Sequence, residues 1–398
     1  MSTEPIDERG LLARFAPTAA LRDRGVGAHV RVTNMELFFD LVYVFSIIQL
    51  SHFLLEHQSW MGAVEAATLF AAVWWAWNYT AWATNWIDPD HTAGRFLMIA
   101  LMACAILMAV AMPYAFEGRA ALFVGAYVFM ALLRAGYMAL VFRGERMGQN
   151  YQQLCAWSAL SGLFWIAGVL LPELRLALWI TAVVIDYGAP FVGFWLPRLG
   201  ATPMESWPLA GLHLLERNQQ VFIIALGESI LLLGGTLVGA TLSSTTVLAA
   251  ALGFAIIVTL WWLYFVHTTE TGEHAFEHDG DHTELARSGL AYAHGIMVAG
   301  AIVVAVAIEE IIAHPADPAH LPTVLVAVTG PAIYLAGSAL FYRTMAERMP
   351  LTYLGGLLAL ALLGWAAHAI HASGLLLGVG VLTVMITLTI LAARERSA

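Results

Sequence analysis

Long runs of apolar residues, separated by short polar segments, fill almost the whole chain. A helix that crosses a lipid bilayer needs about 20 mostly apolar residues, and about twelve runs reach that length. The pattern therefore predicts an all-α fold, a polytopic bundle of about twelve transmembrane helices. The predicted spans are residues 35–55, 62–84, 96–115, 120–142, 153–171, 174–196, 217–240, 244–267, 286–313, 321–342, 350–371 and 374–392.

The polar segments divide these spans into two halves of six. Glu36-Leu-Phe-Phe-Asp-Leu-Val-Tyr-Val-Phe opens the first span, and Glu216-Arg-Asn-Gln-Gln-Val-Phe-Ile-Ile-Ala leads into the seventh. Both halves start in the same orientation, which is compatible with a parallel repeat. The predicted parts are an Arg-rich cytoplasmic segment (1–33), a first six-helix half (34–196), a cytoplasmic connector (197–216), a second six-helix half (217–392) and a cytoplasmic tail (393–398).

Composition agrees with a surface that lipid covers. Of the 398 residues, 60% are hydrophobic and 12% are charged, whereas a soluble domain carries about 25% charged residues. The chain contains no lysine, which excludes retinal or pyridoxal Schiff bases and a P-loop. We expect no cofactor, and no nucleic-acid partner because no basic stripe runs through any segment. The expected partners are the lipid bilayer, a small solute or ion, and a second copy of the chain in a homo-oligomer.

The arginines predict the orientation. Fifteen of the 18 basic residues lie in segments or span ends that are cytoplasmic if the N-terminus is inside, and only Arg119 and Arg175 lie on the outer side. This bias is typical of an inner, cytoplasmic membrane protein with both termini inside. No cleaved signal is expected, because the polar first 30 residues lack an apolar core. Trp74, Trp75 and Trp77 are predicted to anchor the second span at the headgroups.

Three of the acids in the predicted spans lie away from the span ends, where each ionised side chain costs about 2.5–3.5 kcal/mol. Asp40 lies one turn inside the first span, Asp186 is near the middle of the sixth, and Glu228 is near the middle of the seventh. Arg134 is the only arginine well inside a span, and we expect it to pair with one of these acids. The alternative for each acid is a structural role, hydrogen-bonded to a neighbouring helix.

The sixth span also contains residues that interrupt a helix. Gly188 and Pro190 follow Asp186 closely and predict a kink or local unwinding. Broken helices near the bilayer midplane are typical of transporter binding sites. The alternative is a kink that a buried acid stabilises.

Four further polar residues complete the candidate site. Glu36 forms a capping box with Thr33, which is also a sufficient structural explanation for it. Asn78, Gln220 and His294 lie in the inner halves of their spans, although a single histidine is more often a core residue than a ligand. Together with the three acids and Arg134, these residues predict one polar cavity reachable from the cytoplasm. Acids in such a cavity can act as a proton relay.

The hydrophilic segment 268–285 contains three histidines at intervals of four residues. His274, His278 and His282 share one face if the segment is helical, and imidazole is a common ligand of zinc and other divalent ions. Gly280 weakens a helix here, so a solvated acidic loop is the favoured interpretation and a metal site is the alternative. The spacing does not match the longer motifs that define zinc sites.

Two long stretches carry a resemblance to a known family. Met35-Glu-Leu-Phe-Phe-Asp-Leu-Val-Tyr-Val-Phe45 and Leu215-Glu-Arg-Asn-Gln-Gln-Val-Phe-Ile-Ile-Ala-Leu-Gly-Glu-Ser-Ile230 resemble the bacterial low-temperature-requirement A family, as do Trp261-Trp-Leu-Tyr-Phe265 and Tyr292-Ala-His-Gly-Ile-Met-Val-Ala-Gly300. The resemblance implies a multi-spanning bacterial membrane protein and supplies no mechanism. The His-rich segment lies outside the resembling stretches.

These features favour a proton-linked transporter or channel for a small solute or ion. One alternative is an intramembrane enzyme acting on a lipid-linked substrate, for which residues 267–282 are the only candidate metal or catalytic segment. The other is a sensor or assembly factor without turnover. The absence of a predicted soluble output domain argues against a sensor that acts alone. An enzymatic role is the less favoured interpretation.

Overall fold

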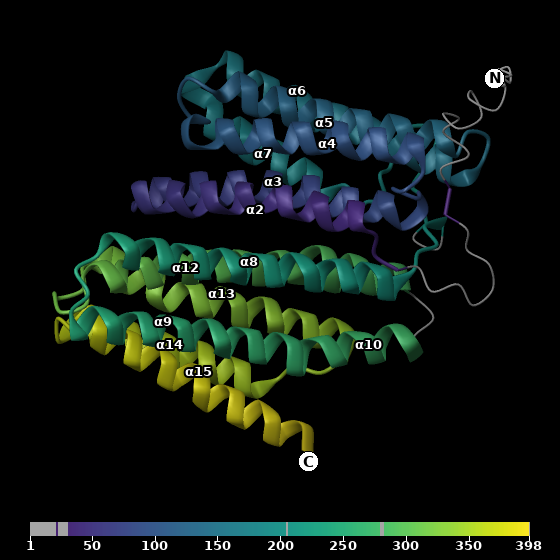
Figure 1. Cartoon of the computed structure of the whole chain (residues 1–398). Helices are drawn as coiled ribbons and strands as arrows, with labels where there is room; N and C mark the ends of the chain where they lie inside the picture. Colours follow the sequence, from purple (N-terminus) through teal and green to yellow (C-terminus); the bar gives the residue numbers. More distant parts are fainter. Residues whose placement is uncertain (1–20, 23–30, 204–205, 279–281, 398) are drawn as a thin grey trace, which may run out of the picture. The chain divides into compact units, whose positions relative to one another are not determined.

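The structure is a computed structural model that describes residues 21–22, 31–203, 206–278 and 282–397. Most of the predicted N-terminal segment 1–33, and Gly280, therefore lie outside the described residues. The described residues form helices joined by turns and loops (Figure 1). Its α-helices are α2 (Asn34–Glu56), α3 (Trp60–Trp86), α4 (Thr92–Ala111), α5 (Ala120–Val141), α6 (Arg146–Leu170), α7 (Arg175–Gly188), α8 (Gly211–Gly239), α9 (Ser244–Trp262), α10 (Thr269–His278), α11 (His282–Leu285), α12 (His294–Ala313), α13 (Leu321–Met345), α14 (Leu351–Ala369) and α15 (Gly374–Ser397).

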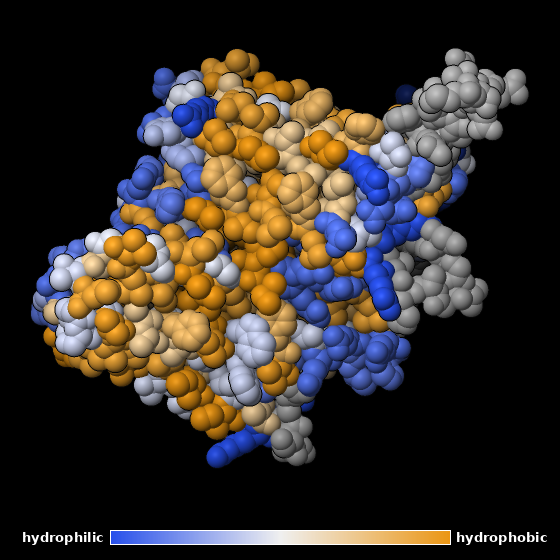
Figure 2. All heavy atoms as spheres, viewed as in Figure 1, coloured by the Kyte–Doolittle hydropathy of each residue, from blue (hydrophilic) through white to orange (hydrophobic). Residues whose placement is uncertain are grey.

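Ten helical stretches among the described residues are long and apolar enough to cross a membrane. Large apolar side chains on them are exposed, for example Leu231 at 63% and Trp365 at 74%. Figure 2 shows apolar residues across much of the visible surface. These observations confirm the predicted polytopic helical membrane bundle. The two remaining predicted spans correspond to α3, which is rich in tryptophan, and to the short α7.

Helix α7 is shorter than the predicted span 174–196. It has 14 residues and is therefore about 21 Å long, less than the roughly 30 Å of the hydrocarbon layer. It ends at Gly188, two residues before Pro190. A proline ring inside a helix clashes with the carbonyl group four residues earlier, so the helix stops before it. Asp186 consequently lies in the last turn of α7 and not in the middle of a helix.

The segment predicted as a polar loop, 268–285, is mostly helical. Helix α9 continues through a π-helical segment, η5 (Leu263–Thr268), into α10. After residues 279–281, α11 leads through a second π-helical segment, η6 (Ala286–Ala293), into α12. A helix can extend into water with polar side chains because its backbone groups stay paired, so the polar composition of this segment does not mark the end of the helix.

The chain folds into two compact units. Unit 1 contains residues 1–49 and 64–214. Within it, α4, α5, α6 and α7 contact one another in chain order. Helix α7 also contacts α3, because the Tyr187 hydroxyl donates to the Ala71 carbonyl over 3.0 Å. Trp74, Trp75 and Trp77 are at most 3% exposed, so the prediction that they anchor α3 at the headgroups is wrong, and they fill the core of this unit.

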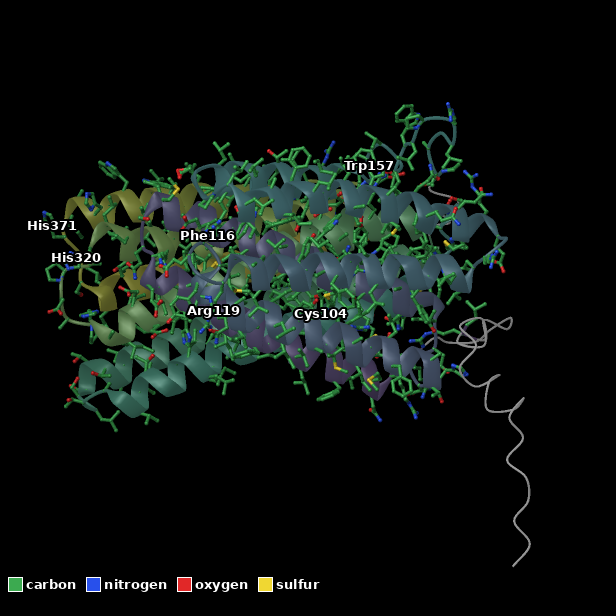
Figure 3. All side chains as sticks on the ribbon, turned by 90° about the horizontal axis from the view of Figure 1, so that it is seen from above. Cys104, Phe116, Arg119, Trp157, His320 and His371 are labelled. Atoms are coloured by element: carbon green, nitrogen blue, oxygen red, sulfur yellow. The ribbon has the colours of Figure 1, made fainter. Side chains whose placement is uncertain are left out.

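Unit 2 contains residues 50–63 and 215–398. Helices α12, α13, α14 and α15 contact one another in chain order, and α15 contacts α9. Helices α12 and α13 lie so close that a Cβ on Gly300 would come within 2.4 Å of the Tyr334 nitrogen. At one end the loops that carry His320 and His371 lie side by side (Figure 3), joined by a hydrogen bond from the Ala319 N–H to the Ala372 carbonyl.

Candidate functional site

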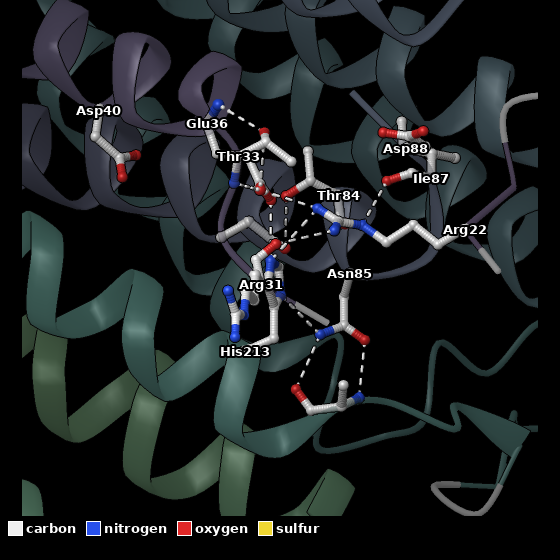
Figure 4. Close-up of polar contacts among 12 residues, drawn as sticks. Arg22, Arg31, Thr33, Glu36, Asp40, Thr84, Asn85, Ile87, Asp88 and His213 are labelled. Atoms are coloured by element: carbon white, nitrogen blue, oxygen red, sulfur yellow. Dashed lines mark hydrogen bonds and ion pairs between the residues drawn. The ribbon is translucent and has the colours of Figure 1, made fainter. Parts of the chain in front are cut away.

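The N-terminal end of α2 is held by a buried network around Glu36 (Figure 4). The Thr33 N–H donates to Oε2 of Glu36 over 2.8 Å, and the Glu36 N–H donates to the Thr33 hydroxyl over 3.3 Å. This is the capping box that the sequence predicted. Arg22 forms an ion pair with the same oxygen at 2.9 Å, and His213 contacts Oε1 at 3.1 Å. Glu36 therefore has a structural role at this end of unit 1.

The contacts of His213 define its tautomer. The Asn85 side-chain oxygen accepts the Ala210 N–H, so the Asn85 NH₂ group points to Nδ1 of His213 at 3.1 Å. Nδ1 must accept this bond, because an NH₂ group cannot accept a hydrogen bond. The proton of a neutral His213 then lies on Nε2, which donates to Glu36. Through these hydrogen bonds to Glu36 and Asn85, His213 connects the start of α8 to α2 and α3.

Arg134 and Asp40 are buried in unit 1 and have separate partners. The Trp77 indole N–H donates to Oδ1 of Asp40 over 2.8 Å, and Figure 4 shows Asp40 apart from the Glu36 network. The Arg134 guanidinium donates to the Ala76 carbonyl over 2.9 Å and to the Thr80 hydroxyl over 3.1 Å. No described acid lies within ion-pair distance of Arg134, so its direct partners are groups of α3 and not one of the candidate acids.

Asp186 is held at the end of α7 by a tyrosine of α5. The Tyr127 hydroxyl donates to Oδ2 of Asp186 over 2.7 Å, and Asp186 is 7% exposed. Arg134 acts on Asp186 electrostatically from a greater distance. Unit 1 thus brings Arg134 and Asp186 into one polar region, with Asn78 buried on α3.

Glu228 of α8 differs from these acids because neither of its carboxylate oxygens has a hydrogen-bond partner in the described part of the chain. The residue is fully buried and lies about 25 Å along the helix from Gly211. The polar groups near enough to influence its carboxyl are Ser51 of α2 and Glu309 of α12. All three residues belong to unit 2.

Glu309 connects this region to the end of α12. Its side chain is half-buried, and Oε2 has no hydrogen-bond partner among the described residues. The exposed His52 acts on it electrostatically. The neighbouring Glu310 is fixed by two donors, the Gln58 amide at 2.8 Å and the Thr323 hydroxyl at 3.1 Å. These acids of unit 2 therefore differ in burial: Glu309 and Glu310, near the end of α12, are half-buried, and Glu228 is fully buried.

His294 is a buried core residue whose two ring nitrogens are both hydrogen-bonded. Its Nε2 accepts from the Tyr264 hydroxyl at 2.7 Å, and Nδ1–H donates to the Gly289 carbonyl at 3.0 Å. Tyr264 and Gly289 belong to the two π-helical segments, which often occur at functional sites. Gln220 lies on α8, with a buried side-chain oxygen that has no described partner.

The structure brings together only two of the three candidate histidines. His274 and His278 lie one turn apart on α10 with ring centroids 4.2 Å apart. His282 starts α11 and packs its ring edge-on against Phe276, at 5.6 Å. Among the described residues, no group of three or more His, Cys, Asp or Glu side chains is arranged to hold a metal ion.

Sequence reasoning missed the partners of the buried acids. Tyr127, Trp77 and Thr80 were not candidates because each fits an ordinary apolar or interfacial helix position. Ser51 and Glu309 belong to spans one and nine, and nothing in the sequence relates them to Glu228. Pairing between distant helices is a property of the packed structure, and a covariation signal across related sequences is the observation that could have found it.

The chain is similar to known proteins over nearly its whole length. A family model described as bacterial low temperature requirement A protein (LtrA) matches residues 31–390. The uncharacterized protein RA0937 of Rhizobium meliloti (strain 1021) is 35% identical over 325 residues, which cover 81% of this chain and 80% of that protein. No solved structure matches the chain. The range matched by the family model contains Glu36, Asp40, Arg134, Asp186 and Glu228.

Proposed function

The chain belongs to the bacterial low temperature requirement A family, and from that membrane architecture and the surroundings of Glu228 we propose a proton-linked transporter or channel for a small solute or ion. It works in the bacterial cytoplasmic membrane with both termini inside, as the distribution of arginines supports. In this function Glu228 takes up and releases the proton or binds the cation, and Asp40, Asp186 and Arg134 shape the polar region of unit 1.

The observation that carries the proposal is that the Glu228 carboxyl has no hydrogen-bond partner among the described residues. A buried polar group without a partner costs about 1–3 kcal/mol, and more when it is charged. Capping and hydrogen bonding explain Glu36 and Asp186, but neither explains Glu228. Because no hydrogen bond from the described residues holds its carboxyl, Glu228 can change protonation state or bind a cation without breaking a hydrogen bond of the described fold.

Two further features support transport. Glu309 is near enough to influence the Glu228 carboxyl, and the exposed His52 acts on Glu309. Linked titratable groups of this kind are expected for a proton route. Helix α7 ends after about 21 Å, two residues after Asp186. A helix that ends short of the full membrane thickness beside a polar residue resembles the half-helices of transporter binding sites.

The test is solute-driven proton movement in liposomes. The full-length protein is reconstituted into vesicles that contain a pH-sensitive dye, and gradients of amino acids, organic acids, sugars and monovalent and divalent cations are applied in turn. We expect at least one gradient to change the internal pH with the wild-type protein and not with Glu228→Gln. The control is Glu173→Gln, at an exposed acid of the segment before α7.

Equal insertion and monodispersity of the variants are checked before flux is compared. The proposal is abandoned if no gradient moves protons or solute through the wild-type protein and Glu228→Gln vesicles are indistinguishable from it. A flux that Glu228→Gln leaves intact keeps transport and removes Glu228 as its proton carrier.

A further inference from the structure

The polar end of the long helix that begins as α9 carries a pair of histidines on one face. His274 and His278 are four residues apart on α10, and their ring centroids lie 4.2 Å apart. Side chains at this spacing are neighbours on a helix surface. Two histidines four apart on a helix, with a glutamate between them, also hold zinc in metallopeptidases, and Glu277 lies between them here.

The ring of His278 is oriented as in a metal ligand. Its Nδ1 lies 2.9 Å from the His274 carbonyl, and since a carbonyl oxygen only accepts, Nδ1 carries the hydrogen. In the neutral imidazole the lone pair is then on Nε2. A ligating histidine usually donates its other N–H to a carbonyl or carboxylate in this way, which fixes the tautomer and the ring orientation.

The pair faces a cavity with room for an ion and its remaining ligands. The cavity has a volume of about 820 Å³ and is lined by His274, His278 and Glu270 of α10 and by Glu347 and Arg348 after α13. The two carboxyl groups outweigh the one guanidinium in charge, which favours a cation. Glu347 has a φ of 51°, a conformation that non-glycine residues adopt rarely and that clusters at ligand sites.

We propose that His274 and His278 form a binding site for a divalent transition-metal ion of the zinc type. Imidazole nitrogen favours Zn²⁺, Co²⁺ and Ni²⁺ over Mg²⁺ and Ca²⁺, which prefer oxygen ligands. Water or a carboxylate lining the cavity completes the coordination, because the described residues supply no third protein ligand in place. The site does not depend on Glu228 and exists whether or not the chain transports protons.

The experiment is a metal titration of the purified, full-length protein after treatment with a chelator. Zn²⁺ and Co²⁺ are titrated by calorimetry, and Co²⁺ is also followed by its visible absorption, which reports nitrogen ligation. We expect about one ion per chain and no competition from Mg²⁺. His274→Ala and His278→Ala should each weaken Zn²⁺ binding by at least about tenfold.

His282→Ala is the matched control, because His282 comes from the same polar segment but packs against Phe276 outside the pair. This variant should bind Zn²⁺ as the wild type does. His274→Ala and His278→Ala should unfold at the wild-type temperature without metal, since both side chains are exposed. The proposal fails if the wild type does not bind Zn²⁺, if neither His274→Ala nor His278→Ala weakens binding, or if His282→Ala weakens it as much as they do.

Discussion

Asp186 in unit 1 and Glu228 in unit 2 are both buried acids of predicted membrane spans, but their surroundings differ. Asp186 accepts a 2.7 Å hydrogen bond from Tyr127 and feels the charge of Arg134. Glu228 is fully buried, and both of its oxygens lack a partner in the described chain. A buried acid with a fixed donor contributes to the fold, whereas one without a donor costs stability and needs another explanation.

The comparison distinguishes two roles of a buried polar residue in a membrane span, a structural one and a functional one. Asp40, Arg134 and Asp186 make specific contacts between α2, α3, α5 and α7, so they stabilise unit 1 in one arrangement. Within the described part of unit 2, the Glu228 carboxyl makes no hydrogen bond of this kind. The expected consequence is that substitutions in the polar region of unit 1 reduce stability, while substitution of Glu228 reduces function only.

The largest loss of stability is expected for Arg134→Met. The substitution removes hydrogen bonds from a charged group to Ala76 and Thr80 and takes the compensating charge away from Asp186. Hydrogen bonds to charged groups contribute about 1.5–3 kcal/mol each, so the free energy of unfolding should fall by about 3 kcal/mol. The measurement is an SDS titration in mixed micelles.

The control for Arg134 is Arg143→Met, which changes an exposed arginine after the same helix. It should leave the unfolding free energy nearly unchanged. Equal unfolding curves for Arg134→Met and the wild type would show that unit 1 does not depend on the buried guanidinium.

A smaller loss is expected for Tyr127→Phe, which removes the donor to Asp186 and leaves the carboxyl buried. An unsatisfied buried acceptor costs about 1–3 kcal/mol. The double variant Tyr127→Phe with Asp186→Leu should lose less than the sum of the single losses, because each single change already breaks the same bond. Strict additivity in the same SDS titration is the result that contradicts an energetic coupling between the two side chains.

The smallest effect on stability is expected for Glu228→Leu. The substitution breaks no hydrogen bond of the described chain and replaces a buried carboxyl with an apolar group of similar size. The unfolding free energy should therefore stay within about 0.5 kcal/mol of the wild type or rise. The same variant should abolish the proton movement proposed for the wild type. A clear destabilisation would instead assign Glu228 a structural partner.

The two histidines of α10 show how far a local pattern can be interpreted. The interval of four residues between His274, His278 and His282 predicted one face of a helix, and α10 confirms that arrangement for the first two. Helix α10 ends at His278, and His282 begins the next helix and packs against Phe276. Spacing predicts a shared face only as far as the helix continues.

The apolar pattern and the family motifs determined that this chain is a polytopic helical membrane protein, because a bilayer imposes its thickness on every helix that crosses it. The capping box was also predictable from the sequence, because its two residues, Thr33 and Glu36, lie within one helical turn. Only the tertiary structure decided that Arg134 binds α3, that Trp77 and Tyr127 satisfy Asp40 and Asp186, and that Glu228 has no partner among the residues described. These side-chain contacts depend on which distant helices pack together, and the pattern of residues along a single helix does not show which helix will be its neighbour.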